Sequence, residues 1–445
     1  MKTATAALLA GLLLAPGMAT ADKPKVTPAD NRPQESVNYF FVDESRLPFE
    51  SLPGTTTTTL WGVHKNAGYR MEVPSNWNGD LVVYAHGFRG NLETPELTVS
   101  NPAIRRHLIE NGYAWAASSY SKNRYDIQAG VLDTQAVTKL FQSQVGRPDR
   151  IYLTGHSMGG HVIGALIEQY PNLYDGASPK CGVMGDFELY DFFFDWILLS
   201  QAIVGIDAQW PDTDFTTTVL PELMPQLGAS PPFVLNENGE KLKTAAKFLS
   251  GGERPLYDTA ILAWWNFLFD RFGDRDGTQS GISVAPTYDN SERVYQLDGD
   301  PDMSPEEMVL NQNILRVTAP PQARPMNGLN NIVPISGDLP IPVLTLHTLG
   351  DLFVPFSMQQ IYAREAAAHG KSDLLVQRAI RDVGHCAFTV EEQEQAFTDL
   401  VTWVEAGMQP AGDDVLDADT VAQPDYGCRF STSGHNPAFL AACAD

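Results

Sequence analysis

The chain has 445 residues, of which 43% are hydrophobic and 19% are charged, so it can bury a sizeable core and is too apolar for a disordered protein. Asp and Glu outnumber Lys and Arg by 54 to 30, and the formal net charge of −24 disfavours binding to nucleic acid or anionic membrane surfaces. At about 100–200 residues per domain, the length allows several domains or one large domain with an insertion.

The first 21 residues have the pattern of a secretory signal peptide. Lys2 precedes the apolar run Ala6–Ala15, which is too short to span a bilayer, and Ala19–Ala21 supplies small residues for cleavage. An amphipathic helix is the alternative, but Pro16 and Gly17 would break it. We expect an exported protein, secreted or periplasmic. Because no later segment has about 18 consecutive uncharged apolar residues, we expect no membrane insertion.

Strands and helices alternate after an extended leader at residues 22–59. Apolar strands are expected at Leu81–Ala85, Tyr113–Ala117, Ile151–Leu153, Gly176–Ser178, Pro342–His347 and Leu374–Ala379. Helices are expected at Pro102–Glu110, with Asn101 as N-cap, and at Asp133–Gln142 and Gly159–Tyr170. Strand, helix, strand at this spacing requires right-handed crossovers and predicts an α/β fold with a mainly parallel sheet.

Residues 186–337 interrupt this alternation. They hold four of the eight Trp residues and the cluster Phe192–Phe194, and hydrophobic runs this dense must be buried. We expect a largely helical cap inserted into an α/β core of residues 60–185 and 338–445. Asp298–Asp302 within it alternates carboxylates without the Gly and Glu of an EF-hand, so we expect a solvated acidic turn, with a bound cation as the alternative.

The segment Gly155-His156-Ser157-Met158-Gly159 carries the strongest chemical signal. It follows a strand and opens a helix, as a nucleophile elbow requires: a strained turn exposes the Ser157 hydroxyl, and the two glycines let strand and helix approach. The Met158 N–H then lies at a helix N-terminus, which favours developing negative charge. A Gly-rich turn is the alternative. At this motif the sequence resembles the α/β-hydrolase superfamily, which implies partners in the chain order serine, acid, histidine.

Asp351 is the expected acid. Gly350-Asp351 follows a buried strand and precedes Val354-Pro355, which looks like the acid loop of that superfamily. An Asx-turn that binds only local amides is the alternative. The gap of 194 positions from Ser157 is too long for two strand–helix units and fits an inserted cap.

His385 is the expected base, because it lies on a loop beyond the next strand. His369 precedes a Gly at a helix end, where a cap explains it, and His435 lies in a polar tail. His86 and His156 precede the acid in chain order, so neither is expected as base. The expected catalytic triad is Ser157, Asp351 and His385.

The oxyanion hole is expected to use two backbone N–H groups. One belongs to Met158. By analogy with families that carry His-Gly after the third strand, the other belongs to Phe88, which follows His86 and Gly87.

The four cysteines suggest two disulfides. Cys428 and Cys443 lie 15 residues apart in the tail, where a bridge would contribute about 3 kcal/mol. A Cys181–Cys386 bridge would fasten the His385 loop to the sheet, and two buried free thiols are the alternative. The His-Cys pair is similar to that of the tannase and feruloyl esterase family, although His156 replaces the Cys that precedes the nucleophile there. No zinc-binding spacing occurs, so no metal and no cofactor are expected.

The predicted function is an exported serine esterase that acts on a small-molecule or polymeric ester. The aromatic cap suggests a bulky or aromatic substrate, although Phe and Trp at helical spacing are more often core. One alternative is an exported aminopeptidase or amidase, in which an acidic residue such as Glu188 would bind a substrate amine. The other is a non-catalytic binding module of the same fold.

Overall fold

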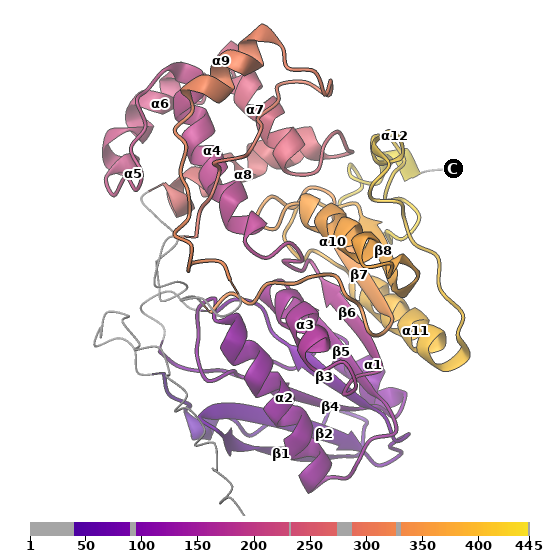
Figure 1. Ribbon diagram of the computed structural model, residues 1–445. Coiled ribbons are helices and arrows are strands. Elements are labelled where there is room, and N and C mark those ends of the chain that lie inside the picture. The colour runs from indigo at the N-terminus through magenta and orange to yellow at the C-terminus, as the bar shows by residue number, and fades with distance from the viewer. Residues whose placement is uncertain (1–39, 90–94, 231–232, 274–286, 326–330, 444–445) are drawn as a thin grey trace, which may run out of the picture. The chain divides into compact units, whose positions relative to one another are not determined.

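An eight-stranded sheet with the order β1-β2-β4-β3-β5-β6-β7-β8 runs through the computed structural model (Figure 1). Its strands are β1 (Thr57–His64), β2 (Ala67–Pro74), β3 (Leu81–Ala85), β4 (Ala114–Ser118), β5 (Ile151–His156), β6 (Gly176–Lys180), β7 (Val343–Thr348) and β8 (Leu375–Ile380). β2 pairs antiparallel with β1 and β4, and all other neighbours are parallel. This is the predicted, mainly parallel sheet of the α/β-hydrolase fold.

The structure describes residues 40–89, 95–230, 233–273, 287–325 and 331–443. The predicted signal peptide and the leader up to residue 39 lie outside these ranges. Within them, no helix is long and apolar enough to cross a membrane.

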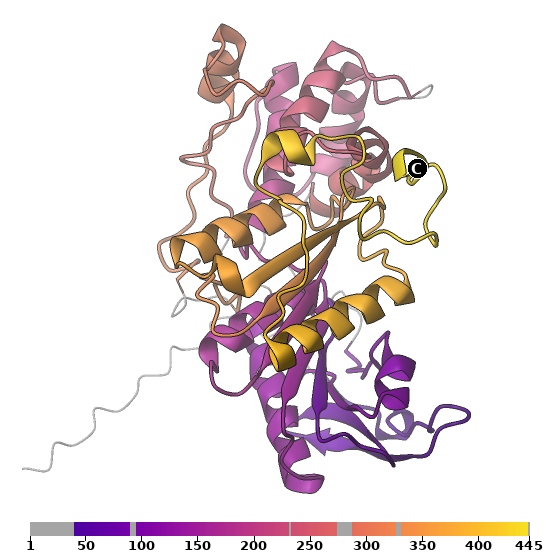
Figure 2. The same ribbon diagram turned by 90° about the vertical axis from the view of Figure 1, so that its right-hand side faces the viewer.

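Helices cover both faces of the sheet because side chains of successive strand residues point to opposite sides. Val83 and Leu153 pack in one core cluster with α2 (Ile127–Gln144), α3 (Met158–Gln169) and α10 (Ser357–Ala368). Val82 and Tyr152 pack in a second cluster with α1 (Arg105–Glu110) and α11 (Val390–Ala406). Figure 2 shows α10 and α11, in orange and yellow, on opposite faces.

Two local predictions are corrected. The helix expected from Pro102 begins at Arg105, because Asn101 does not cap it: the Asn101 Oδ1 accepts a hydrogen bond from Arg70 Nη1 at 3.2 Å. The helix expected from Asp133 begins at Ile127, where the Asp126 side chain accepts from the Ala129 N–H at 2.8 Å. The antiparallel strands β1 and β2 were not predicted.

Six α-helices lie between β6 and β7 in the part of the chain that the structure describes. They are α4 (Glu188–Val204), α5 (Phe215–Thr218), α6 (Leu220–Gln226), α7 (Glu237–Leu249), α8 (Tyr257–Phe272) and α9 (Pro305–Asn313). α4 contacts α6, α7, α8 and α9, so it is the central helix of this group (Figure 1). The helical character predicted for residues 186–337 is therefore present in the described part, whereas its role as a cap stays a prediction.

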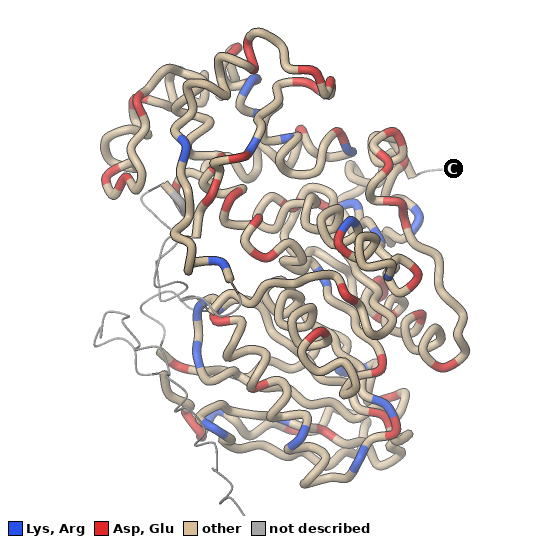
Figure 3. Tube along the Cα trace, viewed as in Figure 1, with Lys and Arg blue, Asp and Glu red and all other residues tan. Residues whose placement is uncertain are grey.

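A buried charge network holds α4 to the segment that follows α8. Asp195 accepts hydrogen bonds from the hydroxyls of Tyr288 and Tyr295 at 2.8 and 2.6 Å, and it lies 3.1 Å from Arg293 Nε. Burial raises the pKa of Asp195 to about 6, although Arg293 opposes the shift. Acidic residues also occur on the sheet helices and on the other inserted helices (Figure 3), so the negative charge of the sequence is not confined to one element.

Candidate active site

Ser157 occupies a strained turn between β5 and α3. Its backbone has φ 58° and ψ −123°, outside the regions that residues with a Cβ normally adopt. A Cβ added at Gly155 or Gly159 would lie 2.6 or 2.2 Å from the Ala85 carbonyl oxygen, so neither position tolerates a side chain without movement of β3. Both glycines of the motif are thus explained by the close approach of β3, β5 and α3.

The structure brings together the three residues that the sequence analysis selected as a triad. His385 Nε2 lies 2.8 Å from Ser157 Oγ, and His385 Nδ1 lies 2.6 Å from Asp351 Oδ2. Asp351 is fully buried, and its other oxygen accepts from the N–H groups of Phe353 and Val354, each at 2.9 Å. The imidazole is therefore positioned between a hydroxyl and an anchored carboxylate, as general base catalysis requires.

The loop after β3 lies directly against the nucleophile. A Cβ at Gly87 would stand 3.3 Å from Ser157 Cβ and 3.2 Å from the His156 carbonyl, so the backbone next to Phe88 passes close to Ser157. Met158 is the first residue of α3, where N–H groups lack intrahelical acceptors. This is compatible with the predicted oxyanion hole of Met158 and Phe88, whose role stays a prediction.

His86 and His156 contact groups other than the Ser157 hydroxyl. His86 stacks on Tyr120 with ring centroids 3.9 Å apart, and its Nε2 lies 3.0 Å from the Ser119 carbonyl. His156 Nε2 lies 2.8 Å from Gln393 Oε1. Burial lowers the pKa of each imidazole to about 3, so both are neutral at pH 7.

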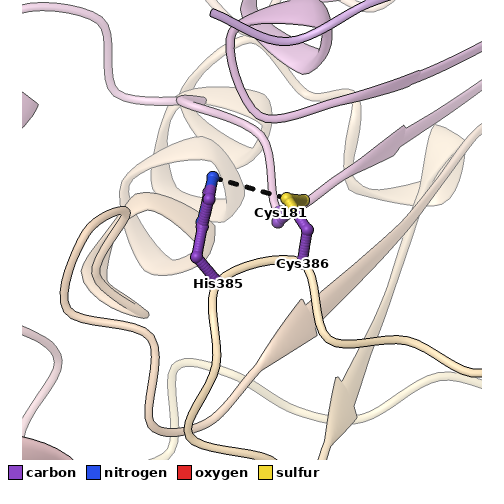
Figure 4. A group of neighbouring side chains, drawn as sticks. All are labelled: Cys181, His385 and Cys386. Atoms are coloured by element: carbon purple, nitrogen blue, oxygen red, sulfur yellow. Dashed lines mark hydrogen bonds between the residues drawn. A yellow bond between two sulfur atoms is a disulfide. The ribbon is translucent and has the colours of Figure 1, made fainter. Parts of the chain in front are cut away.

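Both expected disulfides are present. Cys181 follows β6 and is bonded to Cys386, and Cys428 is bonded to Cys443 in the tail. Figure 4 shows the first bridge beside His385, whose Nε2 lies 3.4 Å from Cys386 Sγ. In the described residues, Cys181, His385 and Cys386 are the one group with metal-ligand spacing. Because thiolates and not disulfide sulfurs bind metals, this group is unsuited to a metal while the bridge is intact.

An aromatic cluster adjoins the imidazole. The ring centroid of Phe353 lies 5.0 Å from that of His385, and Phe353 also contacts Phe193 on α4 and Trp264 and Phe267 on α8. Phe353, Trp264 and Phe267 are only partly buried. The inserted helices therefore supply apolar surface next to the reacting groups.

Three residues that bind the backbone near Asp351, His385 and Ser157 were not predicted from the sequence. Arg254, 3% exposed between α7 and α8, donates from Nε to the Leu349 carbonyl of the acid loop at 2.7 Å. Trp264 Nε1 donates to the Val383 carbonyl of the His385 loop at 2.9 Å. Such bonds between distant segments follow no periodicity, and no sequence signal would have indicated them.

The third is Lys180, the fully buried last residue of β6. Its Nζ donates to Thr154 Oγ1 at 2.6 Å, and its carbonyl accepts from the Ser157 N–H at 2.9 Å. Burial lowers the pKa of this ammonium to about 7. A Lys at the end of an otherwise uncharged strand was the available signal.

Other candidates have structural partners. Glu188 Oε2 lies 2.5 Å from Arg293 Nη2, so it is paired with a residue of the segment between α8 and α9. The turn at Asp298–Asp302 is exposed, and Asp298 and Asp300 each accept from a backbone N–H two residues ahead at 2.9 Å, as a solvated acidic turn would. His369 Nδ1 lies 3.1 Å from the Glu365 carbonyl at the end of α10, as a helix cap would.

The chain is similar to a protein family, to a curated relative and to several solved structures. The model of the prolyl oligopeptidase family matches residues 110–203, which include Ser157. The o-phthalyl amidase of Xanthobacter agilis is 23% identical over 418 residues, covering 80% of this chain and 89% of the relative. The structure of feruloyl esterase B from Aspergillus oryzae aligns with a TM-score of 0.42 at 12% identity, covering 84% of this chain and 86% of that one. An esterase from Pyrococcus furiosus aligns with a TM-score of 0.41 at 11% identity, covering 82% and 97%.

Proposed function

We propose that this serine hydrolase of the α/β-hydrolase superfamily cleaves carboxylic esters through a triad of Ser157, His385 and Asp351. The observation that carries the proposal is the pair of hydrogen bonds made by His385, at 2.8 Å to Ser157 Oγ and 2.6 Å to Asp351 Oδ2. A hydroxyl in contact with a base that is itself oriented by a carboxylate is the arrangement that activates serine for attack on a carbonyl.

In the proposed reaction, Ser157 Oγ forms a bond to the acyl carbon while its proton moves to His385 Nε2. The N–H groups of Met158 and Phe88 stabilise the oxyanion, which in related sites is worth about 3–4 kcal/mol per donor. The bond to the alkoxy group then breaks, and His385 returns the proton to the leaving oxygen. Water attacks the acyl-enzyme by the same steps, releasing the acid and regenerating the Ser157 hydroxyl.

The test is active-site labelling. A fluorophosphonate probe should react with the wild type and not with Ser157→Ala, and the wild type should hydrolyse nitrophenyl acetate while Ser157→Ala retains a residual rate at least about 10³-fold lower. Ser143→Ala on the exposed end of α2 is the matched control and should behave as wild type. Equal labelling of the wild type and Ser157→Ala would refute the proposal.

Amide hydrolysis is the second candidate. It is favoured by the similarity to an o-phthalyl amidase over most of both chains. The same triad serves both reactions, since His385 can protonate an amine leaving group as it does an alkoxide. Matched substrates separate them: a higher kcat/KM on acyl nitroanilides than on the corresponding nitrophenyl esters would favour the amidase.

We further propose that residues 186–337 act as a cap that selects a bulky or aromatic substrate. The partly buried ring of Phe353 beside His385, with Trp264 and Phe267 packed against it, supports this, because aromatic substrates pack well against aromatic rings. A lower KM for nitrophenyl benzoate than for nitrophenyl acetate is expected, and the reverse order would argue against an aromatic site.

The two disulfides support export to an oxidising compartment.

A further inference from the structure

The C-terminal tail, residues 422–443, is attached to the end of β8. Arg381 Nη1 donates to the carbonyls of Pro424 and Tyr426 at 2.9 and 2.8 Å, and Arg381 Nε donates to the carbonyl of Phe439 at 2.6 Å. The Cys428–Cys443 bridge closes this tail into a loop. The tail is therefore a fixed part of the fold, although nothing in the proposed reaction uses it.

His435 is buried within this tail, with 8% of its surface exposed. Its Nδ1 lies 2.9 Å from Asp382 Oδ2, and its Nε2 lies 2.7 Å from Glu392 Oε1. Glu392 also accepts from the N–H groups of Thr432 and Thr389, as an ionised carboxylate does. A neutral imidazole has one N–H, so two carboxylate partners require the doubly protonated cation.

These two carboxylates mark the two ends of the loop that carries His385. Asp382 precedes His385 by three residues, accepts from the Gly384 N–H at 2.8 Å, and joins the acid loop through a bond from the Gly350 N–H to its carbonyl at 2.9 Å. Glu392 follows His385 by seven residues and forms the capping box that starts α11. A group that binds both ends restricts the loop between them.

We propose that His435 is a positioning residue for His385: as an imidazolium it clips Asp382 to Glu392 and so holds the catalytic imidazole within reach of Ser157. This inference rests on the proposed function. A displacement of about 1 Å in a reacting group can cost 100-fold in rate, so a clip on this loop affects turnover without touching substrate.

The clip depends on pH. Among the described residues, the charged side chains that pair with His435 are Asp382 from the loop and Glu392 from α11. Arg381, the residue before Asp382, binds tail carbonyls. Burial lowers the pKa of His435, but the hydrogen bonds to Asp382 and Glu392 and their charges outweigh it, so the pKa lies above its usual 6.5. The clip is therefore complete below pH 6.5 and is lost as the pH rises through the raised pKa.

The experiment compares His435→Gln, which is neutral and carries its N–H donors on a single nitrogen, with His435→Arg, which keeps a cation with several donors. His369→Gln on the exposed end of α10 is the matched control. We expect kcat for nitrophenyl ester hydrolysis at pH 6.5 to fall between about 10- and 100-fold in His435→Gln with KM unchanged, and to recover at least partly in His435→Arg. The gap between wild type and His435→Gln should narrow as the pH rises.

Hydrogen exchange of backbone amides 382–392 gives a readout that does not require catalysis. Faster exchange is expected in His435→Gln and not in His369→Gln. Unchanged exchange, or a kcat within twofold of wild type in His435→Gln, would overturn the inference. Failure of the fluorophosphonate probe to label the wild type would instead refute the proposed function, and the exchange result would still decide whether His435 holds the loop.

Discussion

The loops that carry Asp351 and His385 leave neighbouring strands at the same edge of the sheet, yet they are held in different ways. The acid loop orients its carboxylate with its own backbone, through the N–H groups of Phe353 and Val354, although Arg254 also binds the loop at the Leu349 carbonyl. The His385 loop is bound by side chains from distant segments, among them Cys181 after β6, Trp264 on α8, and His435 in the tail. A carboxylate needs only nearby amides, whereas an imidazole that must face two partners needs restraint from several sides.

The acid loop can be altered chemically without altering its shape. In Asp351→Asn the amide oxygen can still accept from Phe353 and Val354, but the amide N–H₂ faces His385 and imposes the wrong imidazole tautomer. We expect kcat to fall by about 10⁴-fold, with the free energy of unfolding changed by less than about 1 kcal/mol. Steady-state kinetics and urea unfolding measure the two quantities. A loss below tenfold would show that Asp351 is not the functional acid.

The His385 loop is expected to be sensitive to its covalent restraint. Cys181 and Cys386 are 205 positions apart, and in the chain-entropy model their bridge contributes about 5 kcal/mol, against about 3 kcal/mol for Cys428 and Cys443 at 15 positions. Urea unfolding of Cys181→Ser/Cys386→Ser and of Cys428→Ser/Cys443→Ser should show this order. The reverse order would mean that loop length does not govern these bridges.

Burial of the Lys180 ammonium lowers the stability of the fold at β6, the strand that precedes Cys181. The pKa of Lys180 is lowered from 10.5 to about 7, so between these pH values the unfolded chain holds a proton that the folded chain lacks. Between pH 7 and 10.5, Lys180 should therefore raise the free energy of unfolding by about 1.4 kcal/mol for each pH unit. Below pH 7 this residue should add nothing to the pH dependence.

Lys180→Met removes this contribution. The variant should be more stable than the wild type at pH 7 by on the order of 3 kcal/mol, and the difference should shrink at pH 9. Urea unfolding at both pH values decides the matter. A variant less stable than the wild type at pH 7 would show that the bond from Lys180 to Thr154 outweighs the cost of burial.

The smallest effect is expected at the contact with α8. Trp264→Phe keeps an aromatic ring beside Phe353 but loses the hydrogen bond to the Val383 carbonyl, which should lower the free energy of unfolding by about 1 kcal/mol and kcat by less than tenfold. Trp61→Phe is the control, because Trp61 is 43% exposed on β1. Identical behaviour of the two variants would remove Trp264 from the restraints on the His385 loop.

The difference between contacts with nearby residues and contacts with distant residues explains which features the sequence could predict. The core strands, the elbow at Ser157 and the turn at Asp351 are encoded by local patterns, and the structure brings the predicted triad together. The β1–β2 hairpin was missed because its turn residues, Lys65 and Asn66, adopt positive φ without the Gly that usually signals such turns. The buried role of His435 was missed because its partners lie more than 40 positions away.

The Cys181–Cys386 bridge has a topological consequence for the inserted helices. It joins the chain just before α4 to the chain just after β8, so all residues between them belong to a closed covalent ring. A single proteolytic cut anywhere in that ring leaves both fragments joined through sulfur, and the nicked protein keeps its full mass until it is reduced. The inserted segment can be cleaved once without being released.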